Sequence, residues 1–69
     1  MEMIKVQSSN LDSVGYEEKT KVLVINFRNG TYKYFGVPKE IFLNLLGAPS
    51  KGGYHHDFIK EVYQFQKIG

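Results

Sequence analysis

Two adjacent histidines and a nearby serine are the residues of this chain best suited to catalysis. His55 and His56 follow Ser50 within one short segment, and a histidine that contacts a serine hydroxyl can activate it as a nucleophile. Neighbouring residues on a helix point about 100° apart, so the two histidines cannot share a metal ion as an i, i+4 pair would. The plausible nucleophiles are Ser50 and the Ser8-Ser9 pair, and the sequence does not bring nucleophile, base and orienting group together. We therefore predict no enzymatic activity, no metal site and no cofactor.

The segment from Ser50 to Gly53 is a candidate anion site. Its two glycines let a ligand approach the backbone, a helix start offers unpaired N–H groups, and Lys51 adds a positive charge. The spacing is not that of a P-loop. The alternative is a helix cap, with Ser50 as the capping residue and the glycines giving clearance. Tyr54 and His55 follow at once and could stack on a base or a nucleotide.

A β-hairpin is the clearest local structure that the sequence predicts. Two apolar runs flank Asn29-Gly30, the preferred residue pair for a two-residue type I′ turn. Closing the hairpin at this pair sets Ile25 opposite Tyr34. Tyr32 and Tyr34 then lie on the same face of the hairpin, because alternate residues of a strand share a face.

A third strand, about residues 13–17, precedes the hairpin and sets Val14 opposite Leu23. One face of this meander is apolar and is expected to be the core face, with Val14, Tyr16, Leu23, Ile25, Phe27, Tyr32 and Tyr34. The other face is mixed and basic at one end, with Ser13, Gly15, Val22, Val24, Asn26, Arg28, Thr31, Lys33 and Phe35.

Two short helices are expected to cover the core face. Pro38 suits a first helical position and Gly47 ends the apolar stripe, which predicts a helix over residues 38–46. Ser50 is expected to cap a second, short helix that ends between about Phe58 and Lys60, followed by an extended C-terminal tail. The predicted fold class is α+β, a three-stranded antiparallel meander followed by two short helices packed on one face (β-β-β-α-α), in one domain over residues 1–69.

Aromatic and basic side chains on the two sheet faces suggest where a ligand would bind. Tyr32 and Tyr34 could form a stacking platform for bases. Because they share a face with the apolar residues, we predict instead that they are core aromatics whose hydroxyls reach a partner at the edge. The mixed face combines one ring, Phe35, with the cations Arg28 and Lys33, and is the predicted site for phosphates or bases.

The composition excludes several classes of protein. Sixty-nine residues leave room for one core, and the net charge of +2 is far from that of a nucleic-acid packaging protein. The chain has no cysteines and no apolar run that approaches the length of a membrane span. We predict a cytoplasmic protein. A short sheet leaves strand edges that can pair, so a homo-oligomer is compatible with the sequence.

Three stretches of the sequence together resemble the KTSC family, which is named for a C-terminal extension of some lysyl-tRNA synthetases. They are SSNLDSVGY from Ser8, LVINFRNGTYKYFGVP from Leu23, and APSKGGYHHDFI from Ala48. Tyr32-Lys33-Tyr34 matches the family's Tyr-x-Tyr motif, and Gly53, His55 and His56 depart from its pattern. The resemblance implies a compact β-β-β-α-α domain and, from the link to a tRNA synthetase, RNA binding.

The leading hypothesis is a non-enzymatic module that binds RNA or single-stranded nucleic acid. Two alternatives stay open, namely a protein-interaction module or phage-encoded inhibitor of a host protein, and small-nucleotide capture in an oligomer. The candidate ligand-binding residues are Arg28, Lys33, Phe35, Ser50, Lys51, Gly52, Tyr54 and His55, beside the family motif residues Tyr32 and Tyr34.

Overall fold

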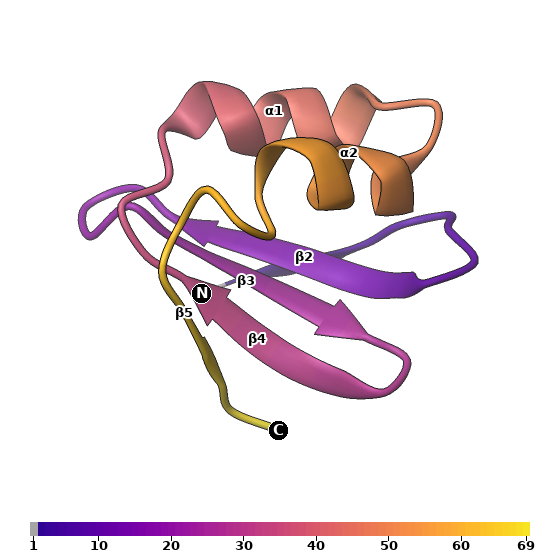
Figure 1. Cartoon of the computed structure of the whole chain (residues 1–69), viewed down its shortest axis with the longest axis horizontal. Coiled ribbons are helices and arrows are strands. Elements are labelled where there is room, and N and C mark those ends of the chain that lie inside the picture. Colours follow the sequence, from indigo (N-terminus) through magenta and orange to yellow (C-terminus); the bar gives the residue numbers. More distant parts are fainter. Residues whose placement is uncertain (1) are drawn as a thin grey trace.

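The chain folds into one antiparallel sheet with two helices on one of its faces (Figure 1). A computed structural model describes residues 2–69. The strands follow one another across the sheet in chain order, so every neighbouring pair is antiparallel. The elements are β1 (Met3–Lys5), β2 (Leu11–Glu17), β3 (Val22–Phe27), β4 (Gly30–Tyr34), α1 (Lys39–Gly47), α2 (Lys51–Phe58) and β5 (Phe65–Lys67).

Five strands replace the three that the sequence predicted, which corrects the β-β-β-α-α order. The two additional strands are β1, which pairs with β2, and β5, which pairs with β4. Each is only three residues long and lies at an edge of the sheet. The expected extended tail is confirmed by β5, and the α+β class is confirmed by the whole arrangement.

The hairpin of β3 and β4 is present, but its register differs by two residues from the predicted one. Phe27 pairs with Gly30 and Ile25 pairs with Tyr32, so the loop residues are Arg28 and Asn29. Neither loop residue has a positive φ, whereas a type I′ turn requires positive φ at both central positions. A shift of two residues leaves every side chain on the same face, and the predicted faces of the hairpin therefore hold.

Gly30 is explained by close packing rather than by the turn. A Cβ atom at this position would lie 2.9 Å from the Gly69 carbonyl oxygen and 2.9 Å from Lys67 Cε. The Thr31 N–H donates to that same carbonyl at 3.2 Å. The C-terminal strand can approach β4 so closely because Gly30 has no side chain.

The β2–β3 pairing is also two residues away from the predicted register. Val14 lies opposite Ile25 instead of Leu23, and the connection is longer because Lys21 adopts a left-handed conformation with φ of 56°. Here too the even shift preserves the faces. Val14, Leu23 and Ile25 are fully buried on the core face as expected.

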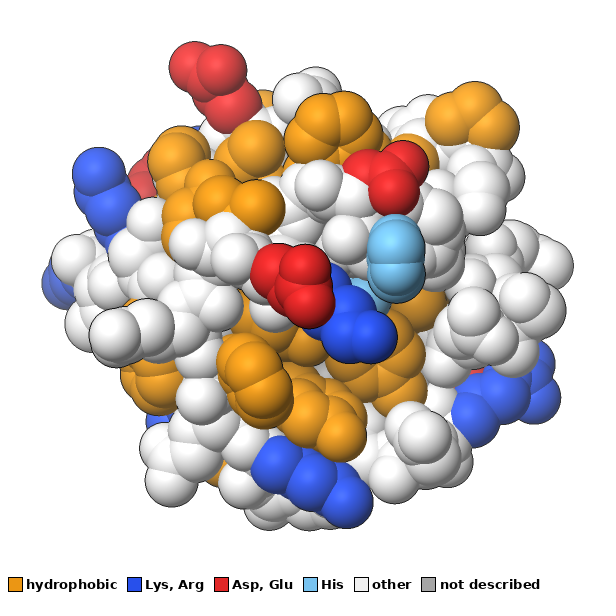
Figure 2. Space-filling model, in the orientation of Figure 1, with side chains coloured by type: hydrophobic (Ala, Val, Ile, Leu, Met, Phe, Trp, Pro, Cys, Tyr) orange, Lys and Arg blue, Asp and Glu red, His pale blue; other side chains and the backbone are white. Residues whose placement is uncertain are grey.

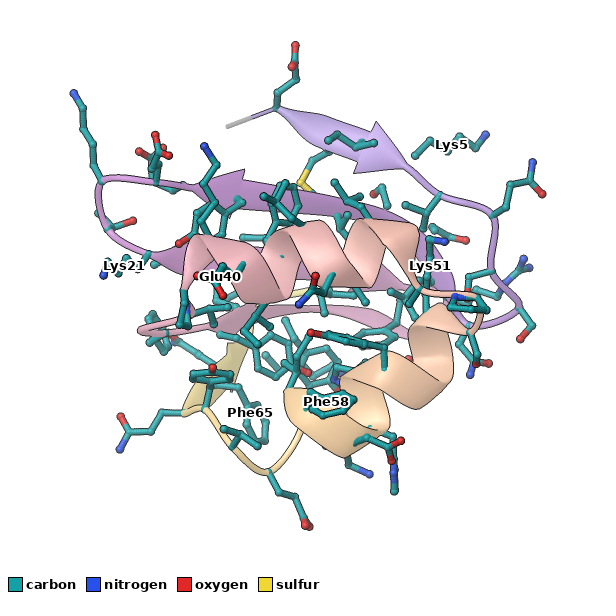
Figure 3. All side chains as sticks on the ribbon, turned by 90° about the horizontal axis from the view of Figure 1, so that it is seen from above. Lys5, Lys21, Glu40, Lys51, Phe58 and Phe65 are labelled. Carbon is teal, nitrogen blue, oxygen red and sulfur yellow. The ribbon has the colours of Figure 1, made fainter. Side chains whose placement is uncertain are left out.

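Both helices cover the core face of the sheet, as seen from above in Figure 3. The core is apolar, and among residues 2–69 it contains no buried polar side chain. Tyr16 of β2 stacks on Phe42 of α1 with ring centroids 5.1 Å apart, and its hydroxyl donates to the Val37 carbonyl at 2.5 Å. The buried core residues are Leu11, Val14, Leu23, Ile25, Tyr34, Val37, Phe42, Leu45 and Ile59.

The starts of the two helices follow from the sequence. Pro38 is the N-cap of α1 and not its first helical residue, so α1 begins one residue later than predicted. Ser50 caps α2, and its hydroxyl oxygen accepts a hydrogen bond from the Gly53 N–H at 3.2 Å, as predicted. Neither helix of the described chain is long and apolar enough to cross a membrane.

Candidate functional site

An aromatic cleft of about 490 Å³ opens between α2, the loop that follows it, and the outer strands β4 and β5. Figure 2 shows hydrophobic side chains exposed below the helices, with charged and histidine side chains at their border. We call this space the aromatic cleft. Its lining residues are Phe27, Asn29, Tyr32, Tyr34, His55, Lys60, Glu61 and Phe65.

The rings of the aromatic cleft pack against one another mainly in edge-to-face and tilted pairs. Phe27 meets Tyr32 edge to face at 5.6 Å between centroids and meets His55 in the same way at 4.8 Å. Phe65 tilts against Tyr32 at 5.9 Å from the far side. Such tilted contacts are favourable for aromatic pairs and fix the ring orientations. The result is a preformed aromatic wall on which a planar ligand could stack.

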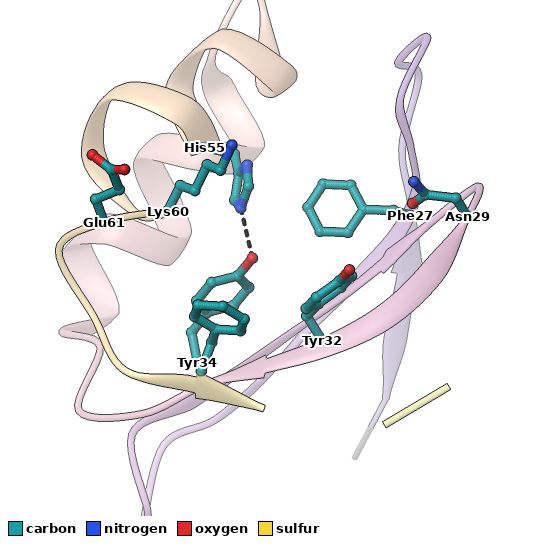
Figure 4. Close-up of a pocket in the computed structure, with 8 residues that line it drawn as sticks. Phe27, Asn29, Tyr32, Tyr34, His55, Lys60 and Glu61 are labelled. Atoms are coloured by element: carbon teal, nitrogen blue, oxygen red, sulfur yellow. Dashed lines mark hydrogen bonds between the residues drawn. The ribbon is translucent and has the colours of Figure 1, made fainter. Parts of the chain in front are cut away.

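Tyr34 and His55 form the inner end of the aromatic cleft, and their side chains are hydrogen-bonded (Figure 4). The Tyr34 oxygen lies 2.7 Å from His55 Nε2. Burial, with a smaller contribution from Tyr32, raises the pKa of Tyr34 to about 12. Burial, with smaller contributions from Lys60 and His56, lowers the pKa of His55 to about 4. Both groups are therefore neutral at pH 7, and the inner wall is uncharged.

A neutral wall suits stacking better than proton transfer. A general base works best with a pKa near the working pH, and the His55 pKa lies well below it. The candidate serine nucleophiles also have structural roles. The Ser50 oxygen caps α2, and the Ser8 oxygen accepts hydrogen bonds from the backbone N–H groups of Asn10 and Leu11 at 3.2 and 3.3 Å.

A second depression of about 310 Å³ lies next to the aromatic cleft, and Phe27, Asn29 and His55 line both. Its other lining residues are Asn10, Arg28 and Gly52. The Arg28 guanidinium donates to the Ser8 carbonyl at 3.4 Å and lies 3.9 Å from the Asp12 carboxylate. Because the Arg28 side chain is exposed, its charge stays accessible to a ligand.

A third depression of about 190 Å³ follows, and Asn10 and Gly52 line it as well. It lies between the loop before β2 and the start of α2. The Lys51 ammonium is close by and donates to the Ala48 carbonyl at 3.2 Å. The residues lining the third depression are Gln7, Ser8, Ser9, Asn10, Pro49, Ser50, Lys51, Gly52 and Gly53. We refer to the three neighbouring depressions together as the hairpin groove.

The hairpin groove brings together most, but not all, of the residues singled out in the sequence. Those that line it are Arg28, Tyr32, Tyr34, Ser50, Lys51, Gly52 and His55. Lys33 and Phe35 lie on the opposite face of the sheet, which no helix covers (Figure 1). Tyr54 points to another side of α2, where it packs on Phe58 at 4.7 Å between ring centroids.

The predicted core role fits Tyr34 better than Tyr32. Tyr34 is only 3% exposed and its hydroxyl has a partner at the edge of the core, whereas the Tyr32 ring is half-buried and lines the aromatic cleft. The two tyrosines of the motif therefore combine a structural and an accessible ring.

Several groove residues were not singled out from the sequence. Asn10, Asn29 and Phe65 come from segments that the sequence analysis treated as loop or tail. Lys60 and Glu61 follow α2 and lie at the rim of the aromatic cleft (Figure 4). The sequence did contain a pointer to the groove. The Ser8-Ser9 pair, the Tyr32-Lys33-Tyr34 motif and the Ser50-Lys51-Gly52 segment follow the order of the family motifs, and residues of all three line the groove.

Comparison with known protein families gives a match to the KTSC domain over residues 7–63. A crystal structure of a KTSC domain protein from Yersinia pestis has a TM-score of 0.95 to this chain at 39% identity. The match covers 99% of this chain and 97% of that one. Fold and family resemblance thus agree.

Relatives occur both within larger enzymes and as proteins of similar size. A lysine-tRNA ligase of Nostoc punctiforme is 37% identical over 67 residues, which are 96% of this chain and 12% of the ligase. An uncharacterized protein of Stutzerimonas stutzeri is 34% identical over 99% of both chains. The chain thus spans about 12% of the length of the ligases that it matches, and their activity belongs to the whole ligase.

Proposed function

The chain belongs to the KTSC domain family. From the geometry we propose that it is a non-enzymatic module that binds single-stranded RNA in the hairpin groove. The observation that carries the proposal is that three neighbouring depressions share lining residues. Aromatic rings line one end, and the cations Arg28 and Lys51 border the remainder. Recognition of unpaired RNA uses this combination of stacked bases and neutralised phosphates.

The proposal places the bases in the aromatic cleft and the backbone along the second and third depressions. Tyr32, Phe65 and the neutral His55 offer ring surfaces to a base. The backbone would pass Arg28 and Gly52, where the Asn10 side chain packs against the glycine and can donate to a phosphate. Duplex RNA cannot offer an unstacked base to the aromatic cleft, so single strands are expected to bind better.

Salt dependence gives the direct test. Three cations line the groove, Arg28, Lys51 and Lys60, so the slope of log affinity against log salt is expected to be about −2 for a single strand. The measurement is fluorescence anisotropy with a labelled short single-stranded RNA and the matching duplex. No binding at low ionic strength, or equal binding of the duplex, would sink the proposal.

Capture of a small nucleotide is the second candidate, and the size of the aromatic cleft favours it. A space of about 490 Å³ lies within the range of small-molecule pockets, roughly 300–1,000 Å³. A mononucleotide that displaces the labelled RNA at comparable concentration would identify the free nucleotide as ligand. Displacement by oligonucleotides alone would identify the strand. Mass spectrometry of gently purified protein then checks for a retained nucleotide.

Gly52→Ala is expected to separate stability from binding. Alanine favours the helix by up to about 1 kcal/mol, but its Cβ would lie 2.8 Å from Asn10 Nδ2 and would push that side chain into the groove. We expect an unchanged or higher melting temperature and RNA binding weaker by about 1 kcal/mol, or about fivefold. Gly47→Ala at the end of α1 is the matched control, because nothing lies within 4 Å of its Cβ and Gly47 lines none of the three depressions. Equal affinity of Gly52→Ala and wild type would show that the strand does not pass Gly52.

A further inference from the structure

The sheet face opposite the helices is open and partly apolar. No helix or strand covers it within residues 2–69 (Figure 1), and the C-terminal strand pairs at the edge instead of folding across it. Met3 and Phe35 are each 39% exposed there and Ile68 is 47% exposed, while Val24 at the centre is 7% exposed. We call this surface the open face. It holds Lys33 and Phe35, which the hairpin groove does not use.

We propose that the open face is the contact surface of a symmetric dimer of this chain, with the two-fold axis running along β3. This proposal is independent of RNA binding, because the hairpin groove lies on the other side of the sheet. In an isologous contact, each residue meets its counterpart across the axis. Central strand β3 then faces itself, and β2 of one copy faces β4 of the other.

Shape across this axis is complementary. Gly15 of β2 and Lys33 of β4 lie on either side of Val24 in the same row of the open face. The rotation therefore sets the long Lys33 side chain over Gly15, where no side chain competes for the space. Val24 meets its own copy at the centre of the contact. Asn26 and Thr31 on the same face are already hydrogen-bonded to each other at 2.9 Å, which lowers the cost of covering them.

Charge across the axis is complementary as well. Glu17 lies two residues beyond Gly15 on the open face, so the Lys33 ammonium of the other copy can reach its carboxylate. The symmetry makes this ion pair twice. Among residues 2–69, Lys33 forms no salt bridge within its own chain. An unrelated partner would have no reason to match this arrangement, whereas a second copy matches it by symmetry.

The size of the open face sets the expected strength of the dimer. The five strands are three to seven residues long and lie about 4.8 Å apart, which gives a footprint of roughly 400 Å² per copy. Standard interfaces bury about 800 Å² per partner, and smaller ones are weak and transient. We therefore expect reversible dimers whose population rises with protein concentration.

A charge-swap experiment tests the dimer. Sedimentation equilibrium of the wild-type chain up to about 1 mM is expected to show a monomer and dimer in exchange. Lys33→Glu and Glu17→Lys each set like charges together and are expected to weaken the dimer at least tenfold. The double variant restores opposite charges, keeps the net charge at +2 and is expected to recover the dimer.

Lys19→Glu is the matched control, because it makes the same charge change in the turn between β2 and β3. It is expected to leave the dimer intact. A wild-type chain that stays monomeric at about 1 mM overturns the proposal. Single variants that dimerise like wild type, or a double variant that stays monomeric, also overturn it. All variants change surface residues. Lys33→Glu is expected to bind a short RNA as the wild type does, so a loss of dimerisation in this variant can be told apart from a failure of RNA binding in the groove.

Discussion

Replacing Tyr32 by leucine is expected to weaken binding of single-stranded RNA by about 5- to 150-fold, since stacking contributes about 1 to 3 kcal/mol per base. The Tyr32 ring is the half-buried aromatic surface between Phe27 and Phe65 in the aromatic cleft. Leucine keeps apolar volume against both rings but offers no planar face. The measurement is fluorescence anisotropy with one labelled single strand at a fixed low salt concentration.

Phe35→Leu is the matched control for this experiment. Phe35 follows the same strand and is an exposed ring, but it lies on the open face and not in the hairpin groove. Its replacement is expected to change the affinity by less than about twofold. The reverse outcome, with Phe35→Leu weakening binding and Tyr32→Leu without effect, would move the RNA site to the open face. Thermal unfolding of both variants checks that each is folded.

The faces of the sheet were predictable from the sequence although the registers were not. Alternation of apolar and polar residues decides which side chains face the helices, and a shift of two residues does not change it. Ile25 and Leu23 are therefore buried as predicted, although their partners differ. Register depends on turn geometry. Asn29-Gly30 would have fixed the register only if both residues had formed the turn, but Gly30 lies in β4 and gives room to the C-terminal segment.

Tertiary contacts decided the features that the sequence left open. Gly30 gives room to the C-terminal strand, and that strand comes from residues more than thirty positions away. Edge strands β1 and β5 are three residues each, too short for a clear alternation pattern. Without β5, Phe65 could not be placed beside Tyr32 and Tyr34, and the aromatic cleft could not be foreseen.

The candidate site is likewise a product of the fold. Its residues come from the loop before β2, the hairpin, the first turns of α2 and the C-terminal tail. The sequence predicted ligand contacts at the start of α2 and placed the bases on the mixed sheet face. Since α2 packs on the core face, His55 and Gly52 face the hairpin from the opposite side to Lys33.

Lowering the pH from 7 to 5 is expected to destabilise the fold through His55. The fold depresses the His55 pKa from 6.5 to about 4, so protons bind more readily to the unfolded chain. The stabilisation from the neutral imidazole is complete above pH 6.5 and is lost as the pH falls toward 4. Because the His55 side chain is partly exposed to solvent, we expect a loss of about 1 to 2 kcal/mol over this range.

His55→Gln is expected to flatten this pH dependence, because glutamine does not titrate and its amide oxygen can still accept from the Tyr34 hydroxyl. Urea unfolding at pH 7 and pH 5 measures the effect.

Glu18 does not contribute to this pH dependence. Its pKa is lowered, first by its hydrogen bond to Lys39, and the stability that it contributes is lost only as the pH falls through the ordinary carboxyl range, below the window from pH 7 to pH 5. His56→Gln is the control, because His56 is exposed, pairs with Asp57, and is the smallest contributor to the lowered pKa of His55. It should keep most of the wild-type pH dependence. A His55→Gln variant that keeps all of it would show that another group carries the effect.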